Sequence, residues 1–220
     1  MSRGKAKGFL FSPFTLNIPE EVGYIGHSQG TTTALWLLAE RPEMSNVLKP
    51  VILLCPIMDM EEVETQTRFL ALEVVRESLR FADGPFLSRS YLLNSLVRSI
   101  CVEHGVTTLC MRALKLFGEF DGPQVNRTRV SVYTSYFPAG ASRKLVSHYI
   151  QTLEYGEMFY FDEGPAGNLV KYGRADPPRV KWEQINSTAL ALFWSKRDVF
   201  SDDKEIRIFK SIVKGNVEVL

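Results

Sequence analysis

Residues 22–30 read Val-Gly-Tyr-Ile-Gly-His-Ser-Gln-Gly. The first five of them form a short apolar run that ends in glycine, which predicts a buried strand. Residues 31–41 are rich in alanine and leucine and contain no helix breaker before Pro42, so they predict a helix. The pattern Gly-x-Ser-x-Gly therefore lies between a strand and a helix, where a tight turn lifts Ser28 above the end of the strand.

The elements beyond this turn predict a parallel sheet. Residues 51–55 form a second continuous apolar run, which ends at Pro56, and they predict another buried strand. Strand character returns at 189–194, followed by a predicted helix at 203–214 and the start of one more strand at 217–220. Because strand, helix and strand in succession are typical of parallel pairing, we expect an α/β fold with a mostly parallel sheet.

A long, mostly helical insertion separates the second predicted strand from the third. From about residue 58 to residue 117, apolar residues recur at helical spacing, with glycine and proline between the runs. Residues 142–155 predict a further helix, with Ser142 as its N-cap and Gly156 just beyond its end. Polar sequence rich in glycine and proline, which predicts a loop, then runs from 162 to 178.

The composition excludes several classes of protein. Hydrophobic residues make up 45% of the 220 residues and charged residues 23%, which is globular rather than disordered composition. With 26 Lys and Arg against 25 Asp and Glu, the net charge of +1 gives no reason to expect a nucleic acid partner. No apolar run approaches the length of a membrane-spanning helix. Three cysteines are too few for a disulfide scaffold, and their spacing does not fit a structural zinc site, so we expect no metal.

The turn at Ser28 predicts a nucleophile and points to its partners. A serine hydroxyl is a poor nucleophile without a base, and in folds with this turn the chain order is serine, acid, histidine. Asp198 follows the predicted strand at 189–194 and is the candidate acid. Asp203 lies further along and is interpreted as a helix cap or a surface charge. The backbone N–H of Gln29 points to the space where negative charge would develop, next to the positive end of the helix dipole.

The histidine of such a triad is absent from the expected place, because no histidine follows Asp198. Three histidines occur earlier in the chain. His27 lies inside the turn, where its side chain is expected to point away from the reacting side. His148 lies on an amphipathic helix and is interpreted as structural. His104 lies in the helical insertion and is interpreted as a surface residue.

These motifs resemble those of the acid lipase family of the α/β-hydrolases, the gastric and lysosomal acid lipases. Residues 23–32 look like the nucleophile segment of that family. Residues 136–142 are similar to its Pro-Ala-Gly-x-Ser segment in the lid region, and residues 194–198 resemble its acid loop. The resemblance covers nearly everything from 19 to 220. It implies Ser28 as the nucleophile, Asp198 as the triad acid and the N–H of Gln29 as an oxyanion donor.

The resemblance also implies a division of the chain and a reaction. Residues 1–18 match nothing in the family, 19–57 and 186–220 would form the hydrolase core, and 58–185 would form a helical cap and lid. An apolar cap suits an acyl-chain substrate and contact with a lipid–water interface, and a lid can exclude water. The implied reaction is hydrolysis of triacylglycerols or sterol esters without a cofactor, in a lysosomal or secreted protein.

The resemblance further implies covalent modifications. Cys101 and Cys110 match the spacing of the cap disulfide of the family, which would leave Cys55 as a free thiol. Asn126 and Asn186 begin Asn-x-Thr patterns that are acceptors for N-glycosylation. Both features fit a protein of the secretory route.

The chain departs from the family in length. We interpret it as a fragment without the first strands, without the loop that carries the second oxyanion donor and without the loop that carries the catalytic histidine. The family's signal peptide is also missing, because the apolar part of residues 1–16 is broken by Ser12 and Pro13 and no cleavage site follows. We expect little or no activity from such a chain, because the members of a triad act as a unit.

Two other functions stay open at this point. A non-catalytic lipase homologue could keep the cap and bind lipid or a partner chain. A peptidase or thioesterase on the same fold is a more distant alternative, because fold and turn alone do not choose the acyl substrate.

Overall fold

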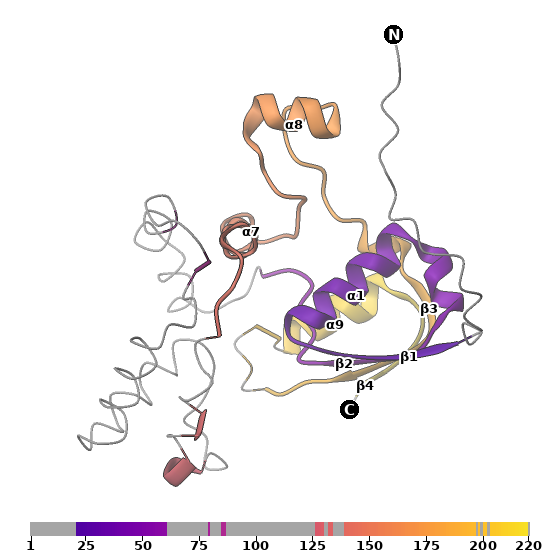
Figure 1. The fold of residues 1–220 in the computed structure, drawn as a ribbon. Coiled ribbons are helices and arrows are strands. Elements are labelled where there is room, and N and C mark those ends of the chain that lie inside the picture. Colours follow the sequence, from indigo (N-terminus) through magenta and orange to yellow (C-terminus); the bar gives the residue numbers. More distant parts are fainter. Residues whose placement is uncertain are drawn as a thin grey trace, which may run out of the picture.

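The computed structural model describes residues 21–60, 79, 85–86, 126–129, 132–133, 139–196, 198, 200–201 and 203–219. Within these ranges it contains a parallel sheet, with helices packed on it and beside it (Figure 1). None of the helices in these ranges has both the length and the apolar character that crossing a membrane requires.

The sheet has four strands in the order in which they occur along the chain, and all neighbours are parallel. The strands are β1 (Val22–His27), β2 (Leu48–Leu54), β3 (Asn186–Phe193) and β4 (Lys214–Val219). One row across the sheet aligns Gly26, Leu53, Leu192 and Val219. The predicted α/β fold with a parallel sheet is confirmed, and β3 and β4 each begin three residues before the predicted strands.

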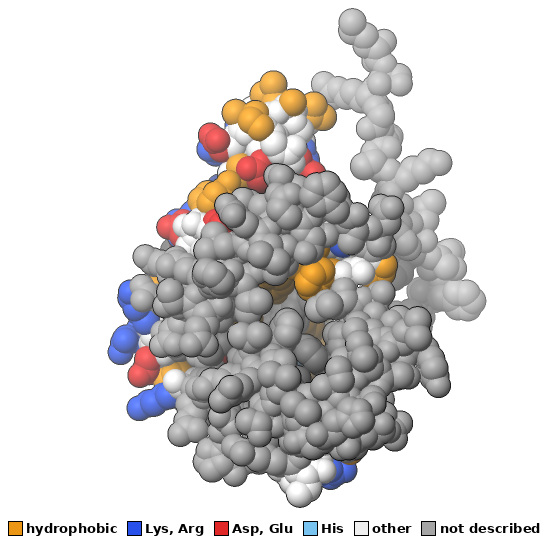
Figure 2. Space-filling model, turned by 90° about the vertical axis from the view of Figure 1, so that its left-hand side faces the viewer, with side chains coloured by type: hydrophobic (Ala, Val, Ile, Leu, Met, Phe, Trp, Pro, Cys, Tyr) orange, Lys and Arg blue, Asp and Glu red, His pale blue; other side chains and the backbone are white. Residues whose placement is uncertain are grey.

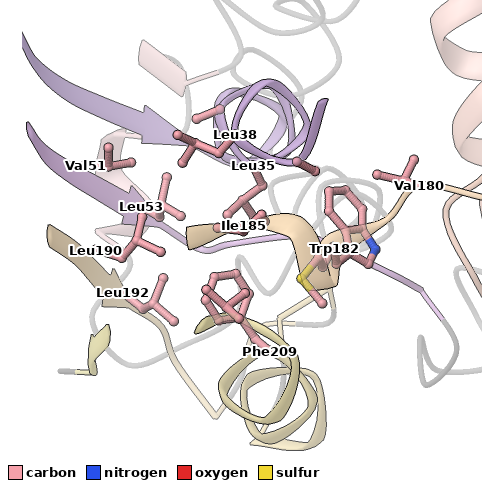
Figure 3. Packing of buried hydrophobic residues seen from close by; sticks show 14 of the residues in the cluster. Leu35, Leu38, Val51, Leu53, Val180, Trp182, Ile185, Leu190, Leu192 and Phe209 are labelled. Atoms are coloured by element: carbon pink, nitrogen blue, oxygen red, sulfur yellow. The ribbon is translucent and has the colours of Figure 1, made fainter. Parts of the chain in front are cut away.

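Two helices pack on the same face of the sheet. The helices of the described ranges are α1 (Gln29–Glu40), α7 (Arg143–Tyr155), α8 (Gly164–Tyr172) and α9 (Asp203–Ile212), with short 3-10 turns η1 (Pro42–Asn46), η3 (Arg127–Arg129) and η4 (Trp182–Gln184). Leu35 of α1 and Phe209 of α9 belong to one buried cluster with the sheet residues Leu53 and Leu192, and Trp182 of η4 completes it (Figure 3). Burial of these side chains holds the helices against the strands, because each buried aliphatic or aromatic side chain contributes about 1.5 to 3 kcal/mol.

The opposite face of the sheet is apolar and largely uncovered within the described residues. Side chains alternate along a strand, so Ile25, Ile52, Leu54 and Phe193 lie on the face away from α1 and α9. Ile25 is 68% exposed and Phe193 is also exposed, while Ile52 and Leu54 are half-buried. A parallel sheet is ordinarily covered on both faces, so this surface is unusual for the fold.

Helix α8 lies where the sequence predicted a polar loop. Its Asn168 is buried, and its amide Nδ2 donates to Asp162 Oδ1 at 2.7 Å and to the carbonyl of Ala175 at 2.8 Å. The Oδ1 atom of Asn168 accepts the N–H of Glu163 at 2.9 Å. Through these bonds the Asn168 side chain holds the residues before α8 and the residues after it. The glycines that suggested a loop include Gly173, the C-cap of α8, whose φ of 73° is left-handed.

The outer side of α8 is apolar. Leu169 and Val170 are exposed, Val170 to 90%, and Figure 2 shows hydrophobic side chains gathered over this helix. The neighbouring helix α7 ends as predicted, at Gly156 with a φ of 75°. Ser142 does stand at the N-cap of α7, but its side chain makes no capping hydrogen bond.

Two buried carboxylates fasten the loop after β2 to distant parts of the chain. Oε1 of Glu205 on α9 accepts the N–H of Met58 at 3.0 Å and the N–H of Asp59 at 2.7 Å. Oδ1 of Asp59 in turn accepts the N–H of Met158 at 2.7 Å and the indole N–H of Trp182 at 3.1 Å. The segment that follows α7 is thereby held on the sheet.

Candidate active site

Three residues mark the carboxyl ends of three neighbouring strands. Ser28 follows β1, Cys55 follows β2, and Asp198 lies in the turn after β3. Because the strands are parallel and adjacent, these ends meet at one edge of the sheet. In open parallel sheets, that edge is where ligands bind.

Ser28 has a backbone conformation that non-glycine residues rarely adopt. Its φ is 51° and its ψ is −116°, at the junction between β1 and α1. Its N–H donates to the carbonyl of Leu54 at 3.0 Å. Its carbonyl accepts the N–H of Thr31 at 2.8 Å and the Thr31 hydroxyl at 2.5 Å. Backbone strain of this kind persists only where surrounding bonds impose it, and it is common at functional turns.

The two glycines of the motif do not have the same role. A Cβ atom on Gly26 would lie 2.8 Å from the backbone carbon and oxygen of Gly30 and from the ring of Tyr24. A Cβ atom on Gly30 would meet its nearest neighbour, the Tyr24 hydroxyl, at 3.6 Å, which is an ordinary contact. The Tyr24 hydroxyl also donates to the carbonyl of Gly30 at 2.7 Å. Gly26 is therefore required by the close approach of the helix, whereas Gly30 has room for a side chain.

Gln29 is the first residue of α1, which begins two residues before the predicted start. The first N–H groups of a helix have no acceptor within the helix, and the helix dipole adds a partial positive charge there. The first turn of α1 contains no acidic side chain that would offset this charge. The start of α1 is therefore suited to a developing negative charge beside Ser28.

Asp198 is held by its own turn and by Cys55. Its N–H donates to the carbonyl of Ser195 at 2.9 Å, and its Oδ1 accepts the N–H of Phe200 at 2.9 Å. Its carboxylate also forms a hydrogen bond with the Cys55 thiol. Burial, this hydrogen bond and the charge of Asp198 raise the pKa of Cys55 to about 11.

Sequence reasoning left Cys55 out of the site. The structure puts it between the ends of β1 and β3, and its φ of 54° is left-handed, like that of Ser28. Its N–H donates to the carbonyl of Phe193 at 2.8 Å. Cys55 directly follows the second predicted strand, just as Ser28 directly follows the first. This equivalent position in the sequence could have identified Cys55 as a residue of the site.

The two described histidines have different surroundings. Nε2 of His148 lies 2.6 Å from the carbonyl of Phe159 and, because a carbonyl only accepts, carries the hydrogen. The His148 ring also packs edge-on against Trp36 and Phe161. Burial is the main cause that lowers its pKa. His27 is exposed and lies on the face of the sheet away from α1. His104 lies outside the described residues.

The remaining predicted residues lie apart from this edge or outside the described ranges. Cys101 and Cys110 are outside them. Asn126 is exposed, and its Oδ1 accepts the N–H of Thr128 at 3.1 Å and the Thr128 hydroxyl at 2.7 Å. Asn186 is exposed at the start of β3. Among the residues that the structure describes, no group of three His, Cys, Asp or Glu side chains could hold a metal ion.

Comparison with known proteins finds lipases. The chain is 31% identical over 193 residues to lipase lipl-5 of Caenorhabditis elegans, which covers 85% of this chain and 48% of that protein. It is 27% identical over 191 residues to human gastric triacylglycerol lipase, which covers 85% of this chain and 47% of that protein. The chain thus spans about half the length of the curated relatives it matches. No family model matches it.

Among solved structures, the α/β-hydrolase MGS-M2 from a Medee basin deep-sea metagenome library aligns with 91% of this chain and 56% of its own. The TM-score is 0.37 and the identity 11%. The sequence matches to the two lipases each extend over 85% of this chain. Over the half that it shares with them, the chain is a homologue of the acid lipases, a family of α/β-hydrolases.

Proposed function

We propose that the chain carries the nucleophile and the acid of a serine carboxylic-ester hydrolase that acts on lipid esters. The observation that supports this most directly is the strained turn at Ser28, with a φ of 51° between a parallel strand and the start of α1. That conformation raises a serine hydroxyl above the strand end, where a base and an ester carbonyl can both reach it.

In the proposed reaction, Ser28 Oγ attacks the ester carbonyl carbon while a base takes the hydroxyl proton. The carbonyl oxygen becomes negative and is stabilised by the N–H of Gln29 at the helix start. Collapse of this intermediate expels the alcohol, which receives the proton, and leaves an acyl group on Ser28. Water then attacks the acyl group by the same route and releases the fatty acid. Asp198 would orient the base and stabilise its charged form.

The substrate class is inferred from the relatives. Human gastric triacylglycerol lipase is named for its substrate, and we propose triacylglycerols or sterol esters for this chain. The exposed Asn126 and Asn186 are then glycosylation sites, Cys101 and Cys110 form a disulfide, and the protein is secreted or lysosomal. Residues 58–185 would form the cap and lid that contact the lipid–water interface.

The base is the missing part of this proposal. No histidine follows Asp198 within the 220 residues, and His148 already donates its Nε2 hydrogen to the carbonyl of Phe159. General base catalysis contributes about a hundredfold to ten-thousandfold to a rate. We therefore propose that the 220-residue chain alone is a weak catalyst.

A second candidate function is lipid binding without turnover, by this chain or in contact with a partner chain. One observation favours it. Among the residues that the structure describes, the carboxylate of Asp198 is in contact with the N–H of Phe200 and the thiol of Cys55 rather than with an imidazole. Each of these contacts uses one acceptor position of the carboxylate, so a base would have to share the positions that remain.

The test is covalent labelling of the 220-residue chain with a fluorophosphonate probe, with and without added imidazole. Imidazole is a soluble substitute for the missing base, so we expect slow labelling that imidazole accelerates by about tenfold or more. Ser28→Ala should abolish labelling under both conditions. A folded chain that is not labelled even with imidazole would exclude an activated Ser28 and favour the lipid-binding alternative.

A further inference from the structure

A cavity of about 310 Å³ lies between α1 and α7, on the side of α1 away from the sheet. One wall comes from α1, which contributes Thr33, Trp36 and Leu37, and the other comes from α7, which contributes Leu145 and His148. Gln29, the residue after Ser28, also lines it. The proposed reaction does not use this space, although the cavity has the size of a small-molecule site.

The lining is more apolar than its residue types suggest. The Thr33 hydroxyl donates to the carbonyl of Gln29 at 3.0 Å, and the Thr32 hydroxyl donates to the carbonyl of Ile57 at 2.9 Å. The Thr152 hydroxyl donates to the carbonyl of His148 at 3.0 Å. These hydroxyl donors are already used within the protein. Each threonine therefore offers mainly its methyl group to a ligand.

Three ring side chains with polar atoms also line the cavity, and the first, Trp36, is in hydrogen-bond contact with Tyr160. His148 donates its Nε2 hydrogen to the carbonyl of Phe159, and burial lowers its pKa, so the ring is neutral at neutral pH. The Tyr149 hydroxyl is in hydrogen-bond contact with the Thr32 side chain, and burial raises its pKa, so it stays protonated. No Asp, Glu, Lys or Arg occurs among the described residues that line the cavity.

This chemistry selects the class of ligand. A sugar, a nucleotide or a carboxylate head group would bury many polar atoms, for which the described lining offers few partners apart from the Gln29 side chain. An alkyl chain has no such atoms and gains from contact with Trp36, Leu37, Leu145 and Met158. Leu37 is 38% exposed, so part of the lining reaches solvent.

We propose that the cavity between α1 and α7 binds the alkyl chain of a fatty acid or fatty acyl group, with the polar head outside it. The choice of a lipid chain over other apolar compounds rests on the lipid-ester hydrolase proposed above. Because α1 begins at the turn that carries Ser28, a chain bound here contacts the helix on which the proposed oxyanion donor lies. The cavity lies on the outer side of α1, and it shares Gln29 with the proposed active site at the strand ends.

The test uses Trp36 as a reporter inside the cavity. A fatty acid brominated in the middle of its chain quenches tryptophan fluorescence on contact, so we expect saturable quenching of the 220-residue chain. An unbrominated fatty acid of the same length should reverse it by competition. Trp36→Phe keeps an aromatic wall and should remove most of the quenching. Quenching that does not saturate, or that is unchanged in Trp36→Phe, would overturn the proposal.

A matched pair of variants tests whether the fatty acid binds in the cavity. Thr33 and Ser211 are both exposed helical residues whose hydroxyls donate to a carbonyl one turn earlier. Thr33→Phe fills the cavity and should weaken binding at least tenfold, whereas Ser211→Phe on α9 should leave it unchanged. Equal binding by the two variants, with circular dichroism showing both folded, would place the lipid elsewhere and refute the site.

The same titration on Ser28→Ala separates this inference from the proposed activity. Binding to the cavity does not need the Ser28 hydroxyl, so the quenching curve should be unchanged. Labelling of Ser28 without saturable quenching would refute the cavity and keep the hydrolase. Quenching without labelling would keep the cavity and refute the hydrolase.

Discussion

At the scale of single residues, the backbone is strained directly after β1 and directly after β2. A non-glycine residue in a sparsely populated region costs about 1 to 3 kcal/mol, and here both Ser28 and Cys55 have positive φ values. The hydrogen bonds of Ser28 to Leu54 and Thr31 hold this conformation.

Gly26 and Gly30 provide a matched test of the turn. Gly26→Ala would put a Cβ atom 2.8 Å from the backbone of Gly30, so we expect it to destabilise the chain by about 2 kcal/mol or more. Gly30→Ala has 3.6 Å of clearance and lies in a helix, where alanine is favoured over glycine by about 1 kcal/mol. Urea unfolding measures both. Equal losses of stability would show that the close approach at Gly26 is not what the motif requires.

The Cys55 thiol is predicted to react slowly. Its pKa is raised to about 11 by burial first and then by the hydrogen bond and charge of Asp198. Only the thiolate is alkylated, so at mildly alkaline pH we expect Cys55 to react roughly a hundredfold more slowly than an unperturbed cysteine. Peptide mapping after iodoacetamide treatment measures the rate.

Two controls define that result. Unfolding in urea should restore the ordinary rate, and Asp198→Asn should restore part of it, because the charge of Asp198 is removed while the burial remains. Rapid alkylation of Cys55 in the folded chain would contradict its contact with Asp198.

At the scale of elements, Asp59 is the connection between the sheet and the segment after α7. Its Oδ1 accepts hydrogen bonds from Met158 and from Trp182, which lie about a hundred residues further along the chain. Burial is the main cause of its raised pKa and outweighs these two bonds and the charge of Arg179, which lower it. The Asp59 side chain therefore stabilises the fold through the two hydrogen bonds that its Oδ1 accepts. Its negative charge has the opposite effect, because a buried charge is unfavourable.

Variants of Asp59 separate these two effects. Asp59→Asn keeps an acceptor oxygen and removes the charge, so at neutral pH it should match or exceed the stability of the wild type. The pKa of Asp59 is higher in the folded chain than in the unfolded chain, so the proton that it binds favours folding. This contribution to the free energy of unfolding is full below the pKa of the unfolded state, and it is lost as the pH rises through the pKa of the folded state. The wild type should therefore gain stability relative to Asp59→Asn as the pH falls, which urea unfolding at a series of pH values measures.

Asp59→Ala serves as the contrasting variant. It leaves the N–H groups of Met158 and Trp182 without their acceptor, and we expect a loss of about 2 to 4 kcal/mol at every pH. If Asp59→Asn were as damaging as Asp59→Ala at neutral pH, the charge itself would be necessary and this account of Asp59 would be wrong.

At the scale of the whole molecule, one face of the sheet exposes apolar side chains among the residues that the structure describes. Ile25 is 68% exposed on a parallel sheet whose other face is packed by α1 and α9. Exposed apolar patches of this kind promote association. We expect the purified 220-residue chain to associate reversibly, with sedimentation velocity showing larger species as its concentration rises.

A pair of lysine substitutions identifies the surface responsible. Ile25→Lys puts a charge on the sheet face and should weaken association. Val170→Lys puts the same charge on α8, where Val170 is 90% exposed, and should have little effect. A stronger effect of Val170→Lys would assign the association to α8, and a chain that stays monomeric over a dilution series would show that the sheet face does not associate.

The local features of the fold could be read from the sequence because neighbouring residues specify them. The strand, turn and helix around Ser28 follow from an apolar run, a glycine motif and a helical pattern within about twenty residues of chain. The C-cap at Gly156 follows from its position after the helical pattern. Parallel pairing followed from the succession of elements, because parallel strands need a crossover between them.

Contacts between distant residues needed the tertiary structure. The Cys55 thiol meets Asp198 only because β2 pairs with β3, and no local pattern reports which strands are neighbours. The hydrogen bond between Asp59 and Trp182, which are 123 residues apart, likewise depends on the pairing of β2 with β3. Helix α8 was missed because its glycine and proline content favours a loop, while the buried bonds of Asn168 stabilise the helix. The cavity between α1 and α7 likewise exists only once the two helices pack, since its apolar character depends on which hydroxyls the folded backbone has already engaged.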